Sequence, residues 1–184
     1  FAKNGLTPPT TFQEWLVVGK ILQAAKITPL ALASREKWPT LHLFENLLVA
    51  AGGVDFYRQL FAGQIPWTDD RVKKALTMLK NLMPMVNNDH AALTWDQACG
   101  YVQSGKAAMT VMGDWAKGYF LAQKLEPDVQ FSAVPTPGTA GVFFVITDTF
   151  GLPAKTKTPQ LTKDFLAVLA SVEGIYLKDL EGRR

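Results

Sequence analysis

The stretch AAMTVMGDWAKGYF, at residues 107–120, constrains the fold more than any other part of the chain. Residues 107–111 form a short apolar run with β-branched side chains, which is typical of a buried strand. Gly113 then permits a sharp turn and lets another group approach the backbone closely. Asp114 is a good helix N-cap, because its carboxylate accepts from the free N–H groups of the first turn. The stretch therefore predicts a strand, a turn and a helix, with Trp115 at the mouth of the turn.

This turn is a candidate place for a ligand. In an open α/β sheet, ligands lie at the carboxyl ends of the strands. The flat indole of Trp115 suits the C–H face of a sugar, and the carboxylate of Asp114 suits its paired hydroxyl groups. The plainer alternative is an ordinary strand–helix turn with a tryptophan in the core.

Apolar periodicity along the rest of the chain predicts an α/β fold. The segments Thr11-Phe-Gln-Glu14 and Thr94-Trp-Asp-Gln97 fit capping boxes, each of which marks the start of a helix. The alternation of helices and short strands favours a three-layer lobe, in which helices flank a mixed, mostly parallel sheet. The expected helices are 12–26, 40–51, 54–62, 69–86, 94–103, 114–125 and 158–169, and the expected strands are 27–34, 107–111, 129–134 and 142–147.

Two of these helices come with more detailed expectations. Thr68 is expected to cap the helix that follows it, and Asp69 and Asp70 then occupy its first turn. The last helix, 158–169, repeats apolar residues at helical spacing, so one face should pack against the lobe. The expected inner face is Leu161, Phe165, Leu166, Val168 and Leu169.

Further residues are suited to a ligand site. Asp148 follows the apolar segment 142–147, so its carboxylate would lie at a strand end, although an Asx turn is the simpler role. Lys37 and Trp38 lie in a polar loop after the first strand, where Trp38 could equally anchor the next helix. His42 lies one turn into that helix, where its more ordinary role is a hydrogen bond to a neighbouring carbonyl.

Composition narrows the class of function. The 184 residues suffice for one domain or one generous lobe, and the net charge is +3 without any Lys/Arg run, so nucleic acid is not an expected partner. The lone Cys99 excludes an internal disulfide and a cysteine-based metal cluster. No apolar run approaches the ~20 residues of a membrane span. Because the chain opens with FAKNG rather than Met, we expect a mature or excised piece.

Catalytic and cofactor motifs are missing from the sequence. It contains no G-x-S-x-G elbow, no P-loop and no G-x-G-x-x-G. His42 and Glu45 lie one turn apart, but two candidate ligands do not make a zinc site. We therefore expect no cofactor, no metal and no catalysis. One enzymatic alternative stays open, a glycosidase-like site that uses Asp114 and Asp148 as its two carboxylates.

Four segments together carry a resemblance to the extracellular sugar-binding proteins of bacterial ABC importers. These are SGKAAMTVMGDWAKGYF with TWDQA ahead of it, LTPPTTFQEWLVVGKILQAAKITPLAL, WPTLHLFENLL, and VFFVITDTFGLPAKTKTP. The resemblance covers residues 1–173 and looks closest to the glucose- and glucose/mannose-binding members. It implies a lobe like those of type II periplasmic binding proteins, and specifically the carboxy-side lobe of a hinged, two-lobed molecule.

The resemblance also implies partners and site residues. A neutral hexose would lie between this lobe and a missing amino-side lobe, and the protein would deliver it, outside the cytoplasm, to membrane permease subunits. Trp115 and Asp148 match the family's binding positions, and Trp38 and His42 match its cleft-facing loop and helix. The neighbours Asp114 and Lys37 complete the expected ligand-binding set. A lobe kept only for contact with the permease is the further alternative.

The last residues depart from the family pattern. After VEG, the family continues into a helix and a turn with a ligand-binding lysine, whereas this chain continues IYLKDLEGRR. Residues 174–184 are therefore expected to form an atypical tail, and Lys178 is not assigned the family's lysine role.

Overall fold

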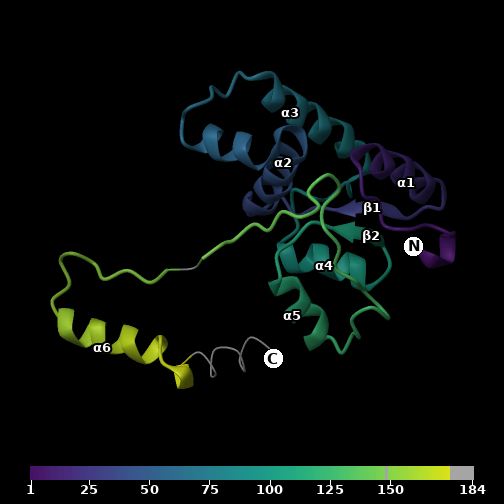
Figure 1. Ribbon diagram of the computed structural model, residues 1–184. Coiled ribbons are helices and arrows are strands. Elements are labelled where there is room, and N and C mark those ends of the chain that lie inside the picture. Colours follow the sequence, from purple (N-terminus) through teal and green to yellow (C-terminus); the bar gives the residue numbers. More distant parts are fainter. Residues whose placement is uncertain (148, 175–184) are drawn as a thin grey trace.

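The computed structural model describes residues 1–147 and 149–174. In these residues the chain is an α/β lobe, rich in helix and built on a small parallel sheet (Figure 1). Its helices are α1 (Phe12–Ala24), α2 (Trp38–Phe61), α3 (Asp70–Leu82), α4 (Trp95–Gln103), α5 (Trp115–Ala122) and α6 (Pro159–Leu169), with 3-10 turns η1 (Ala2–Asn4) and η2 (Met83–Met85). Its strands are β1 (Thr28–Ala31) and β2 (Ala107–Thr110).

The two strands set the frame of the lobe. They run parallel, with Thr28 opposite Ala107 and Ala31 opposite Thr110. Figure 1 shows α2 and α3 on one side of the strands and α4 and α5 on the other, with α1 beside β1. Because the strands are parallel, the segments that leave their carboxyl ends emerge at the same edge. Those two segments lead into α2 and α5.

The main core lies where α1, α2 and α3 pack around β1. Leu43 and Leu47 of α2 are completely buried there, and Trp15 of α1 is 1% exposed. Burial of one such leucine side chain contributes about 1.5–3 kcal/mol relative to its exposed state, so this cluster accounts for much of the stability. Its buried members are Trp15, Leu30, Leu32, Leu43, Leu47, Leu48, Phe56, Leu60, Val72, Ala75, Met78, Leu82, Met85 and Val86.

Local signals at several helix ends predicted the structure correctly. Thr11 and Glu14 form the reciprocal capping box of α1, and Thr94 and Gln97 form that of α4. The expectation for Thr68 was wrong, because Asp69 is the N-cap of α3 and accepts from the backbone N–H of Arg71. A carboxylate one residue later suits the same helix end equally well.

A backbone break divides α2. The sequence predicted two helices, 40–51 and 54–62, separated by a pair of glycines. The structure joins them across a single non-helical residue, Gly53, with φ 82° and ψ 175°. Since an L side chain rarely adopts such a positive φ, glycine is the residue that lets the chain change direction here, between the two helical segments that the sequence predicted.

Two predicted strands are not formed. In 129–134, residues 129 and 130 lie in a turn, and Phe131 makes a single bridge to Pro127. The segment 142–147 has no strand assignment, and Phe143 is 86% exposed. The sheet described is accordingly two-stranded and parallel rather than four-stranded and mixed. An apolar run becomes a strand only when another strand satisfies its backbone groups, and this segment leaves the lobe instead.

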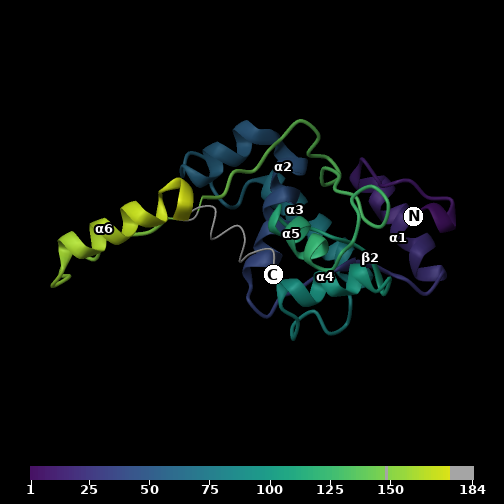
Figure 2. The ribbon, with the colours of Figure 1, turned by 90° about the horizontal axis from the view of Figure 1, so that it is seen from below.

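The prediction of an inner face on α6 was also wrong. Both views show α6 away from the sheet, at the end of the extended segment that follows residue 141 (Figures 1 and 2). None of its residues is buried, and Leu161, Phe165 and Val168 are 60–67% exposed. Its apolar face is present as the sequence indicated, but the described residues provide no surface against which it packs.

No helix in residues 1–147 and 149–174 combines the length and the apolar content needed to cross a lipid bilayer. The expected tail, residues 174–184, lies outside the described residues except for Gly174.

Candidate functional site

Three of the six predicted site residues meet at the carboxyl edge of the sheet. Trp38 and His42 lie in the first turn and a half of α2, which follows β1, and Trp115 opens α5, which follows β2. The ring centroids of Trp38 and Trp115 are 5.7 Å apart at an interplanar angle of 68°. His42 lies 5.1 Å from Trp38 and 5.8 Å from Trp115. We call Trp38, His42 and Trp115 the aromatic trio.

The trio is neither sealed in the core nor fully exposed. All three side chains are half-buried, so each keeps part of its ring accessible to a ligand. Edge-to-face contacts at these distances are favourable, because the positive edge of one ring faces the negative face of another. The arrangement therefore provides an ordered aromatic surface at the edge where parallel sheets bind ligands.

Gly113 sets the position of Trp115. A Cβ placed on Gly113 would collide with the ring of Trp115, so the indole folds back over the backbone of the turn. The sequence predicted that this glycine allows a close approach, and the approaching group is the neighbouring indole. Pro39 restricts the backbone next to Trp38. It is buried at the start of α2, where its ring fixes φ.

The polar members of the predicted set flank the trio in sequence. Lys37 is the N-cap residue of α2 and is exposed. Asp114 is the N-cap residue of α5 and is exposed, but its side chain makes no capping hydrogen bond. The prediction that its carboxylate caps the helix was therefore wrong. The reason lies in the backbone, because φ −63° and ψ −20° are helical values, whereas a capping side chain needs an extended N-cap residue.

Asp148 lies outside the described residues, so the structure gives no distance between it and Asp114 or Trp115. Neither the predicted pairing of two acids nor the glycosidase alternative is tested by this geometry.

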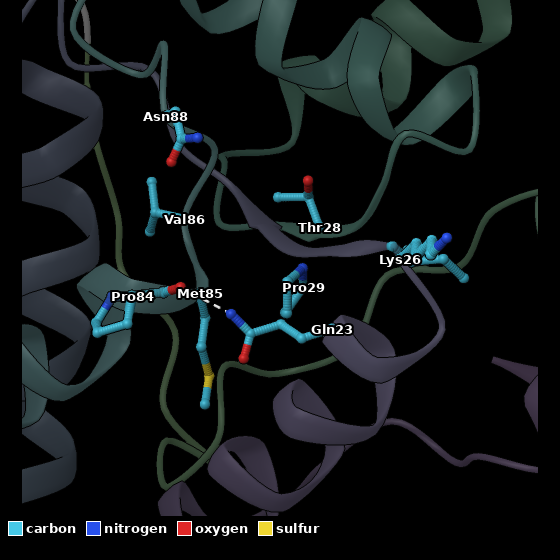
Figure 3. Close-up of a pocket in the computed structure, with 9 residues that line it drawn as sticks. Gln23, Lys26, Thr28, Pro29, Pro84, Met85, Val86 and Asn88 are labelled. Carbon is cyan, nitrogen blue, oxygen red and sulfur yellow. Dashed lines mark hydrogen bonds between the residues drawn. The ribbon is translucent and has the colours of Figure 1, made fainter.

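Neither the thiol of Cys99 nor the two surface hollows described next indicates another site in the described residues. Burial, and secondarily Asp96, raises the pKa of the Cys99 thiol to about 12, so it is protonated at neutral pH. A hollow of about 290 Å³ lies between the start of β1 and η2, where the amide of Gln23 donates to the carbonyl of Pro84 (Figure 3). A second hollow of about 560 Å³ lies between Phe12 and Met78. The aromatic trio lines neither of them.

The structure adds two residues that the sequence did not single out for the site. The carboxylate of Glu36 accepts from the backbone N–H of Trp95, at 3.2 Å. The Nδ1 atom of His90 lies 2.9 Å from the hydroxyl of Ser34. No local pattern could have revealed these contacts, because they join segments more than fifty residues apart.

Comparison with known proteins gives a consistent result. The family described as bacterial extracellular solute-binding protein matches residues 1–175. An uncharacterised ABC transporter extracellular-binding protein of Pyrococcus horikoshii is 43% identical over 175 residues, which are 94% of this chain and 39% of that protein. A protein of Mesorhizobium japonicum described as a probable sugar-binding periplasmic protein is 32% identical, over 94% of this chain and 44% of its own length.

A solved structure supports the same fold. It is a bacterial solute receptor described as exclusively preferring β-D-galactopyranose, and it superposes with a TM-score of 0.60 at 24% identity, over 68% of this chain and 31% of its own. The chain thus spans about two-fifths of the length of the curated relatives named above. The whole-chain family match, the identity to both relatives and the shared fold agree, and the chain belongs to the bacterial extracellular solute-binding protein family.

Proposed function

We propose that this chain is one lobe of a sugar-binding protein that serves an ABC importer, and that its ligand is a neutral hexose resembling glucose. The observation that carries the proposal is the aromatic trio, in which Trp38, His42 and Trp115 come together from two separate helices at the carboxyl edge of the sheet. The printed name of the M. japonicum relative, a probable sugar-binding protein, supports the same class of ligand.

The proposed binding mode follows from the chemistry of the trio. A hexose has an apolar face of C–H groups, which packs on an indole, and a rim of hydroxyl groups, which need polar partners. Asp114 and Lys37 are exposed beside the two tryptophans and would supply an acceptor and a donor. Asp148 would supply a second acceptor. In this proposal the lobe performs no covalent chemistry and only holds the sugar.

The proposal includes a second lobe. The chain spans about two-fifths of its relatives, and the segment after residue 141 leaves the lobe with its apolar residues exposed. Phe143 and Phe165 are 86% and 60% exposed, and large apolar surface of this kind is normally covered by another unit. A sugar bound between two lobes favours their closed arrangement through its additional contacts there, and the closed form would dock on the permease outside the cytoplasm.

The indole N–H signals of the five tryptophans provide a direct test by nuclear magnetic resonance. During a glucose titration, we expect the signals of Trp38 and Trp115 to shift. Trp67 lies in the connection between α2 and α3 and is 52% exposed, and Trp15 of α1 is 1% exposed, so both serve as internal controls. Because half of the contacts are absent from this chain, we expect a dissociation constant of about millimolar or weaker.

The outcomes separate the parts of the proposal. Shifts confined to Trp38 and Trp115 support the trio as the sugar site. The absence of any shift up to the solubility limit of glucose contradicts a sugar site on this lobe. Micromolar binding by the 184-residue chain alone, measured by calorimetry, contradicts a site that is shared between two lobes. A stronger response to xylose than to glucose contradicts the assignment of a hexose.

A further inference from the structure

The turn immediately before Trp38 has an unusual backbone. Lys37 has φ 67° and ψ −41°, and the backbone N–H of Trp38 donates to the carbonyl of Glu36 at 2.8 Å. Together these describe a γ-turn with Lys37 at its centre, in the rare form with positive φ, which is strained for a residue with a side chain. A strained turn persists only when its surroundings hold it.

This turn differs from the other positions where a residue other than glycine has positive φ. Lys26 and Lys124 each stand just after a helix end, where positive φ is a common way to finish a helix. Asp128 lies in the turn between the bridged residues Pro127 and Phe131. Lys37 instead precedes a helix, and its ψ lies outside the left-handed helical region. Helix termination therefore does not explain its conformation.

Contacts on both sides of the turn hold it in place. The carboxylate of Glu36 accepts from the backbone N–H of Trp95, at 3.2 Å. Ser34 makes two contacts with His90, since its N–H donates to the His90 carbonyl at 2.7 Å and its hydroxyl lies 2.9 Å from Nδ1. The same hydroxyl lies 2.9 Å from that of Thr40, in the first turn of α2. The segment 90–95 thus braces the turn and the start of α2 together.

We propose that Glu36 and His90 are positioning residues, which hold the strained turn at Lys37 so that Trp38 stays packed against Trp115. The proposal deepens the proposed function and rests on it for its biological meaning, because an aromatic surface preset before sugar arrives loses less entropy on binding. Glu36 and His90 act through Trp38, and neither is placed in contact with the sugar.

Circular dichroism in the far ultraviolet tests the proposal without any sugar. The indole rings of Trp38 and Trp115, with centroids 5.7 Å apart, couple their electronic transitions. The signal of this pair is the difference between the far-ultraviolet spectra recorded with Trp38 and with Trp38→Phe in the same background. We expect Glu36→Ala to reduce this difference at least about twofold, because a support lost behind a site loosens its geometry. Glu36→Gln keeps an oxygen that accepts from Trp95 and should preserve the signal. Asp70→Ala, which removes an exposed carboxylate far from the turn, is the matched control.

The same measurement on His90→Ala tests the contacts that His90 makes with Ser34, on the amino-terminal side of the turn. We expect a reduction here too, with the melting transition still cooperative. An unchanged difference signal in folded Glu36→Ala overturns the role of Glu36, and an unchanged signal in folded His90→Ala overturns that of His90. If Glu36→Ala does not fold, Glu36→Gln and Glu36→Asp decide the point, since the shorter Asp should lose the signal that Gln retains.

The outcome is separable from that of the sugar titration. If the circular dichroism difference falls in these variants but glucose does not shift the indole resonances, the positioning role is supported and the proposed function is refuted. If the circular dichroism difference is the same in all variants but glucose shifts the indole resonances, the proposed function is supported and the positioning role is refuted.

Discussion

At the scale of single residues, Gly113 and Asn87 show how little room the structure leaves for substitution. The ring of Trp115 occupies the space that a Cβ on Gly113 would need. Asn87 is only 6% exposed and lies beside the end of β1. The amide oxygen of Asn87 accepts from the backbone N–H of Leu32 at 2.8 Å, and its NH₂ donates to Asp89 at 2.7 Å. Each residue is thus required by a specific neighbour.

Replacement of Gly113 by alanine should displace Trp115 from the trio. The new methyl group collides with the indole, and such overpacking costs about 1–3 kcal/mol. Gly118, inside the helix that follows the turn, is the matched control, because a Cβ there meets nothing within 4 Å. Thermal unfolding and near-ultraviolet circular dichroism measure both effects. A Gly113→Ala chain as stable as Gly118→Ala, with an unaltered tryptophan spectrum, would contradict this account.

Loss of the Asn87 amide should destabilise the fold. In Asn87→Ala the buried N–H of Leu32 has no acceptor, and an unsatisfied group of this kind costs about 1–3 kcal/mol. The adjacent Asn88 is exposed, so Asn88→Ala should change the free energy of unfolding by less than about 0.5 kcal/mol. Urea unfolding of the two variants gives the comparison, and equal midpoints would refute the structural role of Asn87.

At the scale of elements, the two capping boxes were predictable and the strand partners were not. The capping boxes at Thr11 and Thr94 are local signals, complete within four residues, and both are present in the structure. The run 142–147 looked like a strand because of its composition, but a strand also needs a neighbour, which the sequence of the segment cannot specify. The prediction that the apolar face of α6 packs against the lobe was wrong for the same reason. Amphipathic spacing predicts a helix with an apolar face, but it does not specify the surface that this face contacts.

The N-cap of α3 should make stability depend on pH. Hydrogen bonds from Arg71 hold the pKa of Asp69 at about 2, below its ordinary value near 3.8. A carboxyl group with a lowered pKa in the folded state contributes stability above its unfolded pKa, and this contribution is lost as the pH falls toward 2. Asp69→Asn keeps the cap but cannot titrate. We expect the difference in melting temperature between the chain and Asp69→Asn to shrink between pH 5 and pH 2.

That pH experiment has a clear opposing result. A difference that is constant across the range would show that the carboxylate of Asp69 contributes nothing as a charge. Added salt should weaken the effect, because the side chains of Arg71 and Asp69 are both partly exposed to solvent.

A pair of phenylalanines distinguishes the packed helix from the unpacked one. Phe120 of α5 is 6% exposed and packs in the cluster with Cys99 and Ala116. Its replacement by alanine should cost about 3–5 kcal/mol, as in other cores. Phe165 of α6 is 60% exposed, so Phe165→Ala should change stability by less than about 0.5 kcal/mol. Chemical unfolding of both variants is the measurement, and a large loss for Phe165→Ala would show that α6 packs on this lobe.

At the scale of the whole molecule, the meeting of the aromatic trio was easier to predict than the contacts behind it. Trp38, His42 and Trp115 were named from strand-end logic and from resemblance, and the parallel pairing of β1 with β2 places them together. Their role in binding sugar stays a prediction. The contacts of Glu36 and His90 were not predicted, since they depend on how distant loops pack. The sequence thus indicated which side chains gather at the edge, while the supports behind them needed the structure.

The parallel register of β1 and β2 has a consequence for how the chain could be used. Thr28 meets Ala107 only after the long intervening stretch has been closed into a loop, so the two tryptophans cannot touch until that closure is complete. A backbone cut in the connection 62–69 would put Trp38 on one polypeptide and Trp115 on the other, while residues of α2 and α3 share the main core of the intact lobe. If the two halves reassemble, the coupled signal of the paired indoles should return, so reassembly could be followed without an added label.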